Sequence, residues 1–550
     1  MQQTTLCVPL DVKPDSCARL TALVDALKVR EDHGAGPAMP NFDRIAQSVP
    51  ALHFMSMSVF PGNAFDPLFV LEANFDGPPG VFWGQMEALL GPDLRAIIRC
   101  CKRPLDGDKL LYDAVTMSTA SPAVAYLEAR TQMPSVFFHG NRGLTRDQII
   151  EGHTLFMAVQ DEINDPVRAV PNPYRTGGPA SVHQRLRQAM LPRFPGLGTA
   201  AARRISLADH MLDYVRVIGF LVLILLALSL PGVMLAAAMP VQVYLATVVV
   251  LAAVTIGLVW RNRLAITGME VTTGTKIKLL GPLRLALLAL AVALYTVITV
   301  VILAPGVMFL TYLLVVVAHT GYVSPRDVLV GTAWLVGLGL VSIAATGPFL
   351  LLMLRYNELR DSSQDQPTPD PLLLRDIVRR EDWIMQNHMG SIVHIKPGML
   401  RAAIIRAGHS GLGLFLRATA TDGYLGSMRT VHYAHWAFLN NTSRLIFLSN
   451  FDHSWDSYLD DFIEKSHAGL TLSWGCGVGF PPTRLLVFDG ASHGRQFKAW
   501  ALASRTASRF WYSAYRDLTV DQIEREYRIS TGLRRLSMTD QEATAWAWDL

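Results

Sequence analysis

The stretch VIGFLVLILLALSLPGVMLAA, residues Val217 to Ala237, has no charged side chain, and a second uncharged stretch runs from Val241 to Trp260. Each is about twenty residues long, which in a helix covers the roughly 30 Å hydrocarbon core of a bilayer. Only the turn Ala238-Met239-Pro240 separates them. We therefore predict two transmembrane helices joined in a tight hairpin.

The apolar block continues to Arg355 and predicts further spans. A third runs from about Leu285 to Leu303 and a last from about Val328 to Leu354. The apolar piece Pro305 to Ala318 between them has only about fourteen residues, fewer than the roughly seventeen needed to cross. Because it begins with Pro-Gly, it reads as a kinked extension of the third helix or a re-entrant turn. We predict four spans, with five as the alternative.

Basic residues near the ends of the spans predict the orientation, since Lys and Arg stay on the cytoplasmic side. They precede the first span, separate the second from the third and follow the last: Arg203, Arg204, Arg216, Arg261, Arg263, Lys276, Lys278, Arg284, Arg355 and Arg360. We therefore expect an integral protein of the bacterial inner (plasma) membrane with both termini in the cytoplasm. The spans carry almost no ionisable side chain, which favours anchoring over transport.

The composition agrees with a membrane protein that also has soluble parts. Of 550 residues, 51% are hydrophobic and 17% charged, which leaves polar sequence for two domains of ordinary size. The net charge of +4 is small and the basic residues form no stripe with aromatics, so we expect the lipid bilayer and no nucleic acid as a partner. Five cysteines lack a zinc-type spacing, so we expect free thiols and no metal site: Cys7, Cys17, Cys100, Cys101 and Cys476.

The region before the membrane block alternates strand and helix signals. Strands are predicted at Thr4 to Val12, Leu52 to Phe60, Leu68 to Ala73, Arg95 to Cys101 and Ser135 to His139. Helices are predicted after the first strand, after the third, over Pro122 to Gln132 with Ser121 as its cap, and after the cap Thr145. With extensions, this is the β-α-β-β-α-β order of ferredoxin-like domains.

The region after the membrane block repeats the first. Lys396-Pro397 matches Lys13-Pro14, Val431-His432-Tyr433 matches Leu52-His53-Phe54, and Asn450-Phe451-Asp452 matches Asn74-Phe75-Asp76. Near the end, LTVDQI (518–523) aligns without a gap with LTRDQI (144–149). The matches follow one another in the same order, which indicates an internal duplication.

We therefore predict an α+β protein in which two ferredoxin-like domains flank the transmembrane region. The first domain covers residues 1–165, the membrane region 211–355 and the second domain 386–550. Proline and glycine interrupt the stretch 166–210, and three prolines lie in the polar stretch that follows the membrane region. We expect 166–210 and 356–385 to be linkers.

Two ferredoxin-like sheets on one side of a membrane have faces available for pairing, so we expect the two halves to dock on each other. A ligand pocket would be lined by the strands around His53 to Phe60 and His432 to Phe438, with Tyr433 and Trp436 among its residues. By the period of two, Tyr433 and Trp436 lie on opposite faces of their strand, one at the sheet interface and the other under the helices. The equivalence of His53 and His432 in the two copies favours a structural role.

Two such units in one chain, able to pair into an α+β barrel, resemble the arrangement of dye-decolourising peroxidases. The segment His432 to Lys465, with HYAHWAF and SNFDHSWDSYLDDFIEK, also resembles a family of bacterial membrane proteins, some of them labelled peroxidase-like. The resemblance implies haem, which needs one proximal imidazole. The candidate ligands are His435, His467 and His493, which occur only in the second copy.

A different motif, Gly490-Ala491-Ser492-His493-Gly494, fits the G-x-S-x-G pattern of a nucleophile elbow. However, no histidine follows Ser492 except His493, so the Ser, acid, His order of α/β-hydrolases cannot be completed. Asp489-Gly490 is therefore interpreted as a turn.

Two function classes follow. The first is a membrane-anchored tandem ferredoxin-like protein that binds a small or lipidic ligand or a protein partner at the cytoplasmic membrane surface. The alternative is a haem-dependent, peroxidase-like oxidoreductase. Fold analogy alone does not decide between a binding protein and an enzyme.

Overall fold

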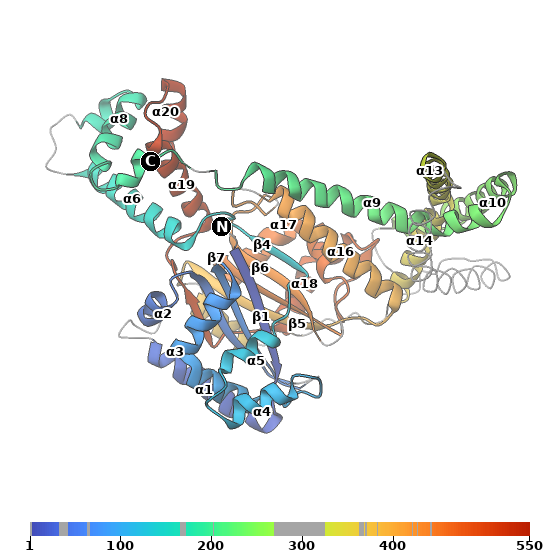
Figure 1. Cartoon of the computed structure of the whole chain (residues 1–550), viewed down its shortest axis with the longest axis horizontal. Coiled ribbons are helices and arrows are strands. Elements are labelled where there is room, and N and C mark those ends of the chain that lie inside the picture. The colour runs from blue at the N-terminus through green and yellow to red at the C-terminus, as the bar shows by residue number, and fades with distance from the viewer. Residues whose placement is uncertain are drawn as a thin grey trace. The chain divides into compact units, whose positions relative to one another are not determined.

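The computed structural model describes residues 3–31, 42–62, 66–165, 172–201, 203–268, 325–361, 363, 368, 371–381, 383–420, 422–425, 427–439 and 443–550. The protein is of the mixed α+β class (Figure 1). Its chain divides into two compact units. The first comprises Met1–Asp213, Asp365–Phe480 and Ala491–Leu550, and the second comprises Tyr214–Gln364 and Pro481–Gly490.

Two antiparallel sheets form the centre of the first unit. One has the order β1–β3–β2–β11, built from β1 (Gln3–Asp11), β2 (Leu52–Phe60), β3 (Leu68–Asp76) and β11 (Phe510–Ser513). The other has the order β10–β5–β7–β6–β4, built from β4 (Val136–His139), β5 (Gln386–His394), β6 (Val431–Leu439), β7 (Arg444–Asp452) and β10 (Arg505–Thr506).

The two halves of the sequence exchange their last strands. β4 belongs to the first half but pairs with β6 of the second, with Phe137 opposite His435, while β11 of the second half pairs with β2, with Trp511 opposite Ser56. After β4 the backbone runs so close to the second half that a Cβ atom on Gly140 would lie 2.2 Å from the Val431 carbonyl oxygen. The sheets thus differ from two self-contained ferredoxin-like domains, because each is completed by a strand of the other half.

Both sheets have the same register. Thr5 of β1 lies opposite Asn74 of β3, and His388 of β5 lies opposite Asn450 of β7. Each sheet also has one irregularity at the same place, where the pairing skips His53 in β2 and His432 in β6. Equal registers give each inward-facing residue of one half a defined counterpart in the other half.

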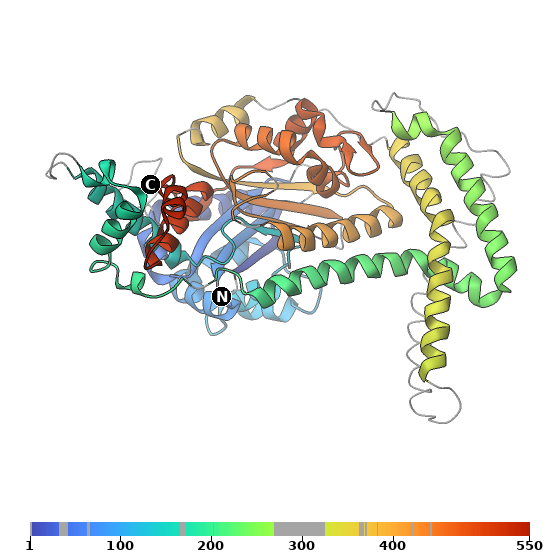
Figure 2. The same cartoon turned by 90° about the horizontal axis from the view of Figure 1, so that it is seen from above.

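Helices cover the outer face of each sheet (Figures 1 and 2). The first sheet packs its outer side chains against α1 (Cys17–Glu31), α2 (Asp43–Ser48), α3 (Pro79–Cys100), α4 (Lys109–Met117) and α5 (Ala123–Ala129). The second packs against α15 (Pro371–Glu381), α16 (Met399–Thr419), α17 (Trp455–Trp474) and α18 (Gly494–Ser504).

Two local predictions in the first half are wrong. Arg95 to Cys101 is not a strand: Arg95–Cys100 forms the end of α3, because Ile97 and Ile98 continue the buried stripe that Leu90 and Leu94 begin. Ser121 does not cap α5, whose N-cap residue is Pro122. A short apolar run without a breaker fits either a strand or a buried helix, so periodicity alone does not separate the two.

A helical lobe of the first unit is built by both halves from α6 (Arg146–Asn164), α7 (Pro173–Thr176), α8 (Pro179–Met190), α19 (Val520–Arg534) and α20 (Asp540–Ala547). Thr145 caps α6 as predicted, and Thr519 caps α19 through the same capping box with a glutamine three residues later. The lobe joins Leu186 of α8 to Leu155 and Ile529 in one apolar core. The stretch 166–210 therefore contains a packed helix, where we expected only a linker.

The second unit contains α9 (Leu207–Ala238) from Tyr214 on, together with α10 (Val241–Arg261), α11 (Arg263–Thr267), α13 (Pro325–Val341) and α14 (Ile343–Leu359). Among the described residues, α9 and α10 are long and apolar enough to cross a membrane, and Ala333–Val341 with Ile343–Leu359, bent by 46°, makes a third candidate if the pair is one span. The chain is thus compatible with a membrane protein. The predicted span Leu285 to Leu303 and the piece Pro305 to Ala318 lie outside the described residues.

A buried carboxylate holds a loop of the second unit to α14. The loop Pro481–Gly490 contains β8 (Thr483–Arg484) and β9 (Phe488–Asp489). Glu358 accepts hydrogen bonds from the backbone N–H groups of Leu485 and Leu486, each at 2.9 Å, and pairs with the guanidinium of Arg355 at 3.2 Å. The two leucines have φ values of 54° and 63°, a conformation that costs free energy outside glycine. Arg355, used above to predict orientation, is therefore a buried ion-pair partner.

Candidate acid–base site between the two sheets

The inward faces of the two sheets carry a group of buried polar residues between apolar ones. The inward-facing residues of β2 are Phe60, Ser58, Ser56 and Phe54, so two hydroxyl side chains lie between two aromatic ones. Side chains alternate along a strand, so Glu72 of β3, His388 of β5 and His435 of β6 all point into the same space. The side chains of these three residues are almost completely buried.

Glu72 is the centre of this group. Its Oε2 atom lies 2.7 Å from His388 Nε2, and its Oε1 atom lies 3.5 Å from His435 Nδ1. The amide of Asn74 donates to Oε1 at 3.0 Å, and the amide of Asn450 approaches the same oxygen at 3.4 Å. The hydroxyl of Ser56 donates to Oε2 at 3.2 Å. One carboxylate is thus held by both halves of the chain.

These contacts keep the carboxylate ionised. Burial by itself raises the pKa of Glu72, but the charge and hydrogen bond of His388, with help from His435 and Asn74, outweigh it and lower the pKa to about 2. Burial lowers the pKa of His435, although the charge of Glu72 opposes this. At neutral pH, the site therefore presents an anionic carboxylate beside a neutral imidazole.

His388 connects this carboxylate to the edge of the unit. Its Nδ1 atom is hydrogen-bonded to the hydroxyl of Ser508, which also contacts the Ser58 hydroxyl at 3.0 Å. Ser508 is only half-buried. His388 and Ser508 therefore form a chain of hydrogen bonds that runs from Glu72 to a half-buried hydroxyl.

His435 is the unusual member of the site. It is fully buried, yet neither ring nitrogen makes a hydrogen bond with any described residue. Its Nδ1 atom lies 3.5 Å from Glu72 Oε1 without forming a hydrogen bond. Leaving a buried polar group unpaired costs about 1 to 3 kcal/mol, and such groups in native proteins point to a role other than stability.

The equal registers of the two sheets supply an internal comparison for this site. By the shared register, the counterpart of Glu72 is Leu448, that of His388 is Thr5, and that of His435 is Ser56. The second copy thus has an apolar residue where the first has the carboxylate, and the first copy has hydroxyls where the second has imidazoles. Contacts that only hold two equivalent sheets together could use the same residue types in both copies. The difference between the two copies therefore favours a role for Glu72, His388 and His435 beyond stability.

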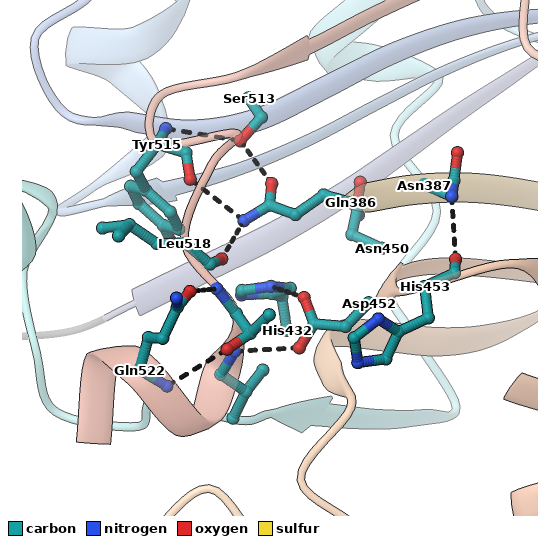
Figure 3. Close-up of polar contacts among 12 residues, drawn as sticks. Gln386, Asn387, His432, Asn450, Asp452, His453, Ser513, Tyr515, Leu518 and Gln522 are labelled. Atoms are coloured by element: carbon teal, nitrogen blue, oxygen red, sulfur yellow. Dashed lines mark hydrogen bonds and ion pairs between the residues drawn. The ribbon is translucent and has the colours of Figure 1, made fainter. Parts of the chain in front are cut away.

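A second set of buried polar residues is instead repeated in both copies. His432 Nε2 lies 2.8 Å from Asp452, which also accepts the N–H of Val520 at the start of α19 (Figure 3). In the first half, His53 Nε2 lies 3.0 Å from Asp76, which accepts the N–H of Arg146 at the start of α6. Carboxylates stabilise helix N-termini. The repetition assigns both histidines to this structural task.

The other predicted site residues occupy different environments. Tyr433 points between the sheets, near His53 and Phe54, whereas Trp436 lies under the helices, with its ring centre 4.4 Å from that of Phe447. His467 is exposed on α17, and His493 is half-buried at the N-cap of α18. Of the three predicted haem ligands, only His435 belongs to the group between the sheets.

The arrangement around His435 does not fit a haem. Its ring is enclosed, with Leu448 and Phe137 opposite it on the neighbouring strands and Glu72 facing it from the other sheet. A planar macrocycle on either nitrogen would displace this packing. Ser492, the central residue of the G-x-S-x-G match, is exposed in a short 3₁₀ turn, and the described residues around it supply no acid and histidine in triad order.

The sequence reasoning missed Glu72 and His388. The available signal was the strand LFVLEANFD, in which the carboxylate Glu72 lies in the middle of the strand among mostly apolar residues. Within the described ranges, no group of three or more His, Cys, Asp or Glu residues has a geometry that could hold a metal ion. Comparisons of the chain with protein-family models, with curated proteins and with solved structures find no match.

Proposed function

We propose that the chain is a membrane-anchored protein whose duplicated, ferredoxin-like halves bind a small polar molecule between their sheets, where the ionised carboxylate of Glu72, held by His388, accepts hydrogen bonds from that molecule. The anchor lies in a bacterial inner membrane, and both soluble halves lie on its cytoplasmic side. The observation that carries the proposal is His435, a fully buried imidazole without a hydrogen bond beside an ionised carboxylate.

The site chemistry favours a ligand with an O–H or N–H group. Ionised Glu72 accepts hydrogen bonds, while neutral His435 offers one acceptor and one donor nitrogen. His388 links the carboxylate to the hydroxyl of Ser508 and so fixes its position. Asn450 and Ser56 orient the carboxylate, so its position is set before a ligand arrives.

The test uses the full chain in lipid nanodiscs and a defined mixture of small amines, amides and hydroxy acids. The protein is desalted rapidly and denatured, and the retained molecules are identified by mass spectrometry. We expect the wild type to retain at least one compound that the variant Glu72→Leu/His388→Thr/His435→Ser does not. That variant gives each site residue the identity of its counterpart in the other copy.

The matched control is Met389→Leu. Met389 lies next to His388 in β5, faces the helices and also takes the identity of its counterpart, Leu6. It should retain the same compound as the wild type. Equal retention by the triple variant, or no retention by the wild type, would contradict the proposal.

A further inference from the structure

The group between the sheets offers a bound molecule hydrogen-bond acceptors. Glu72 is ionised, and a carboxylate can only accept hydrogen bonds. The Nδ1 atom of His435 lies 3.5 Å from this carboxylate. Because a carboxylate repels the lone pair of a neighbouring nitrogen, the proton of the neutral ring belongs on Nδ1 and the lone pair on Nε2. This buried Nε2 atom has no hydrogen-bond partner among the described residues, so a molecule bound there has to donate to it.

The carboxylates of the inward faces outnumber the lysines and arginines. Three of them, Glu72, Asp76 and Asp452, have side chains that are no more than 7% exposed. Among the described strand residues that face between the sheets, the only lysine or arginine is Arg444, which pairs with an aspartate of β1 at 3.2 Å. The thiol of Cys7 faces the same space, and burial together with the charge of Glu72 raises its pKa. These charges favour a cation between the sheets.

Apolar packing on both sides limits the size of such a cation. On one side, a Cβ atom on Gly390 would lie 2.9 Å from the ring of Phe60 and 3.0 Å from Leu448. On the other side, the rings of Phe54 and Tyr433 belong to one buried apolar cluster, with their centres 5.5 Å apart. Because neither side has room for a long chain, a molecule bound between them has only a few non-hydrogen atoms.

We propose that the molecule bound between the sheets is a small primary ammonium ion. One of its N–H groups donates to Nε2 of His435, and its positive charge interacts with the carboxylate of Glu72 beside this ring. The inference rests on the proposed function and narrows it, because a hydroxyl or a neutral amide can also donate but carries no charge.

The test measures binding by equilibrium dialysis, with the full chain in lipid nanodiscs and four radiolabelled compounds of similar size. Ethylammonium is the cation, acetamide and ethanol are neutral donors, and acetate is the anion. The variant His435→Ser removes the acceptor nitrogen and introduces the residue of its counterpart, Ser56. The matched control is again Met389→Leu, whose side chain faces the helices.

We expect the wild type and Met389→Leu to bind ethylammonium at least about tenfold more tightly than acetamide or ethanol, because a charged donor makes a hydrogen bond roughly twice as strong as a neutral one. Acetate should not bind, and His435→Ser should lose the preference for ethylammonium. Equal or tighter binding of a neutral compound or of acetate would overturn the inference and leave the proposed function standing. Binding of none of the four would overturn the inference, and the proposed function would fail with it only if the defined mixture also yields no retained compound.

The tautomer of His435 is tested without any variant that has to bind. Solid-state nitrogen NMR of the histidine-labelled wild type distinguishes a protonated ring nitrogen from one with a lone pair, and the signal is assigned by its loss in His435→Ser. We expect the proton on Nδ1, and a changed Nε2 signal when ethylammonium is added. A proton on Nε2 in the free protein would overturn the inference, because that nitrogen could not accept a hydrogen bond.

Discussion

Glu72 and His388 are 316 residues apart in the sequence, yet the carboxylate oxygen of one lies 2.7 Å from the imidazole nitrogen of the other. The first residue comes from the half before the long apolar helices and the second from the half after them. Because both side chains are almost completely buried, the pair exists only when the two sheets have packed together.

Removal of one partner should destabilise the protein strongly. In His388→Thr, the ionised carboxylate of Glu72 stays buried without the imidazole that is hydrogen-bonded to it, and an unsatisfied buried charged group typically costs at least about 1 to 3 kcal/mol. Urea unfolding in detergent measures the change. As a control, Arg380→Ala breaks the exposed pair with Asp376 and should cost less than about 1 kcal/mol. Equal losses of unfolding free energy in the two variants would show that the buried contact stabilises the protein no more than the exposed ion pair does.

A buried histidine near the site predicts a pH dependence of stability. Burial, together with the charges of His53 and Arg142, lowers the pKa of His139 from 6.5 to about 3. Below pH 6.5, His139 binds a proton in the unfolded chain but stays neutral in the folded chain. The free energy of unfolding therefore falls as the pH drops from 6.5 toward 3, by up to about 1.4 kcal/mol per pH unit.

The variant His139→Ser should lack this contribution. Serine is the residue of the second copy, since Ser513 lies opposite Phe54 as His139 lies opposite Tyr433. The difference in unfolding free energy between wild type and variant should therefore shrink steadily between pH 6.5 and pH 5. A difference that does not change with pH would refute the assignment of a neutral, buried imidazole.

The repeated aspartates should behave alike. Asp76→Asn and Asp452→Asn each remove the negative charge that faces a histidine and a helix N-terminus. We expect each to reduce the free energy of unfolding by about 1 to 3 kcal/mol, with values close to each other. Ligand retention by the folded protein should be unaffected. If Asp452→Asn alone no longer retained the ligand, the functional site would lie at the end of the sheets where Asp452 is.

The loop that Glu358 holds should open when the carboxylate is removed. In Glu358→Gln, one oxygen becomes an amide N–H₂ group, so the N–H groups of Leu485 and Leu486 cannot both keep their acceptor. Hydrogen exchange of these two amides should accelerate by about tenfold to a hundredfold, while the amides of β7 serve as an unchanged reference. If the hydrogen-exchange rates of these two amides do not change, contacts other than Glu358 keep Leu485 and Leu486 in their positive-φ conformation.

Local signals in the sequence predicted several elements correctly. Thr145 was predicted as the N-cap of α6 and is its N-cap, and the predicted strand Leu52 to Phe60 coincides with β2. The uncharged stretch Val217 to Ala237 lies within α9. These features depend on neighbouring residues alone, which is why one sequence suffices to find them.

Features that depend on distant residues could not be predicted in the same way. The residues of β4 form a strand whichever sheet they join, so nothing in Val136–His139 indicates that it pairs with β6. Likewise, Glu72 and His388 are ordinary strand residues until the register of both sheets is known. The comparison with Leu448 and Thr5 then identifies them.

The most direct test of the account is the stability and ligand retention of Glu72→Leu/His388→Thr/His435→Ser, compared with His388→Thr alone. Removing a buried carboxylate together with its partners leaves no uncompensated buried charge. We therefore predict that the triple variant has a higher free energy of unfolding than His388→Thr and retains none of the compounds. If it is as unstable as His388→Thr, or still retains them, the group between the sheets is a structural link and not the functional site.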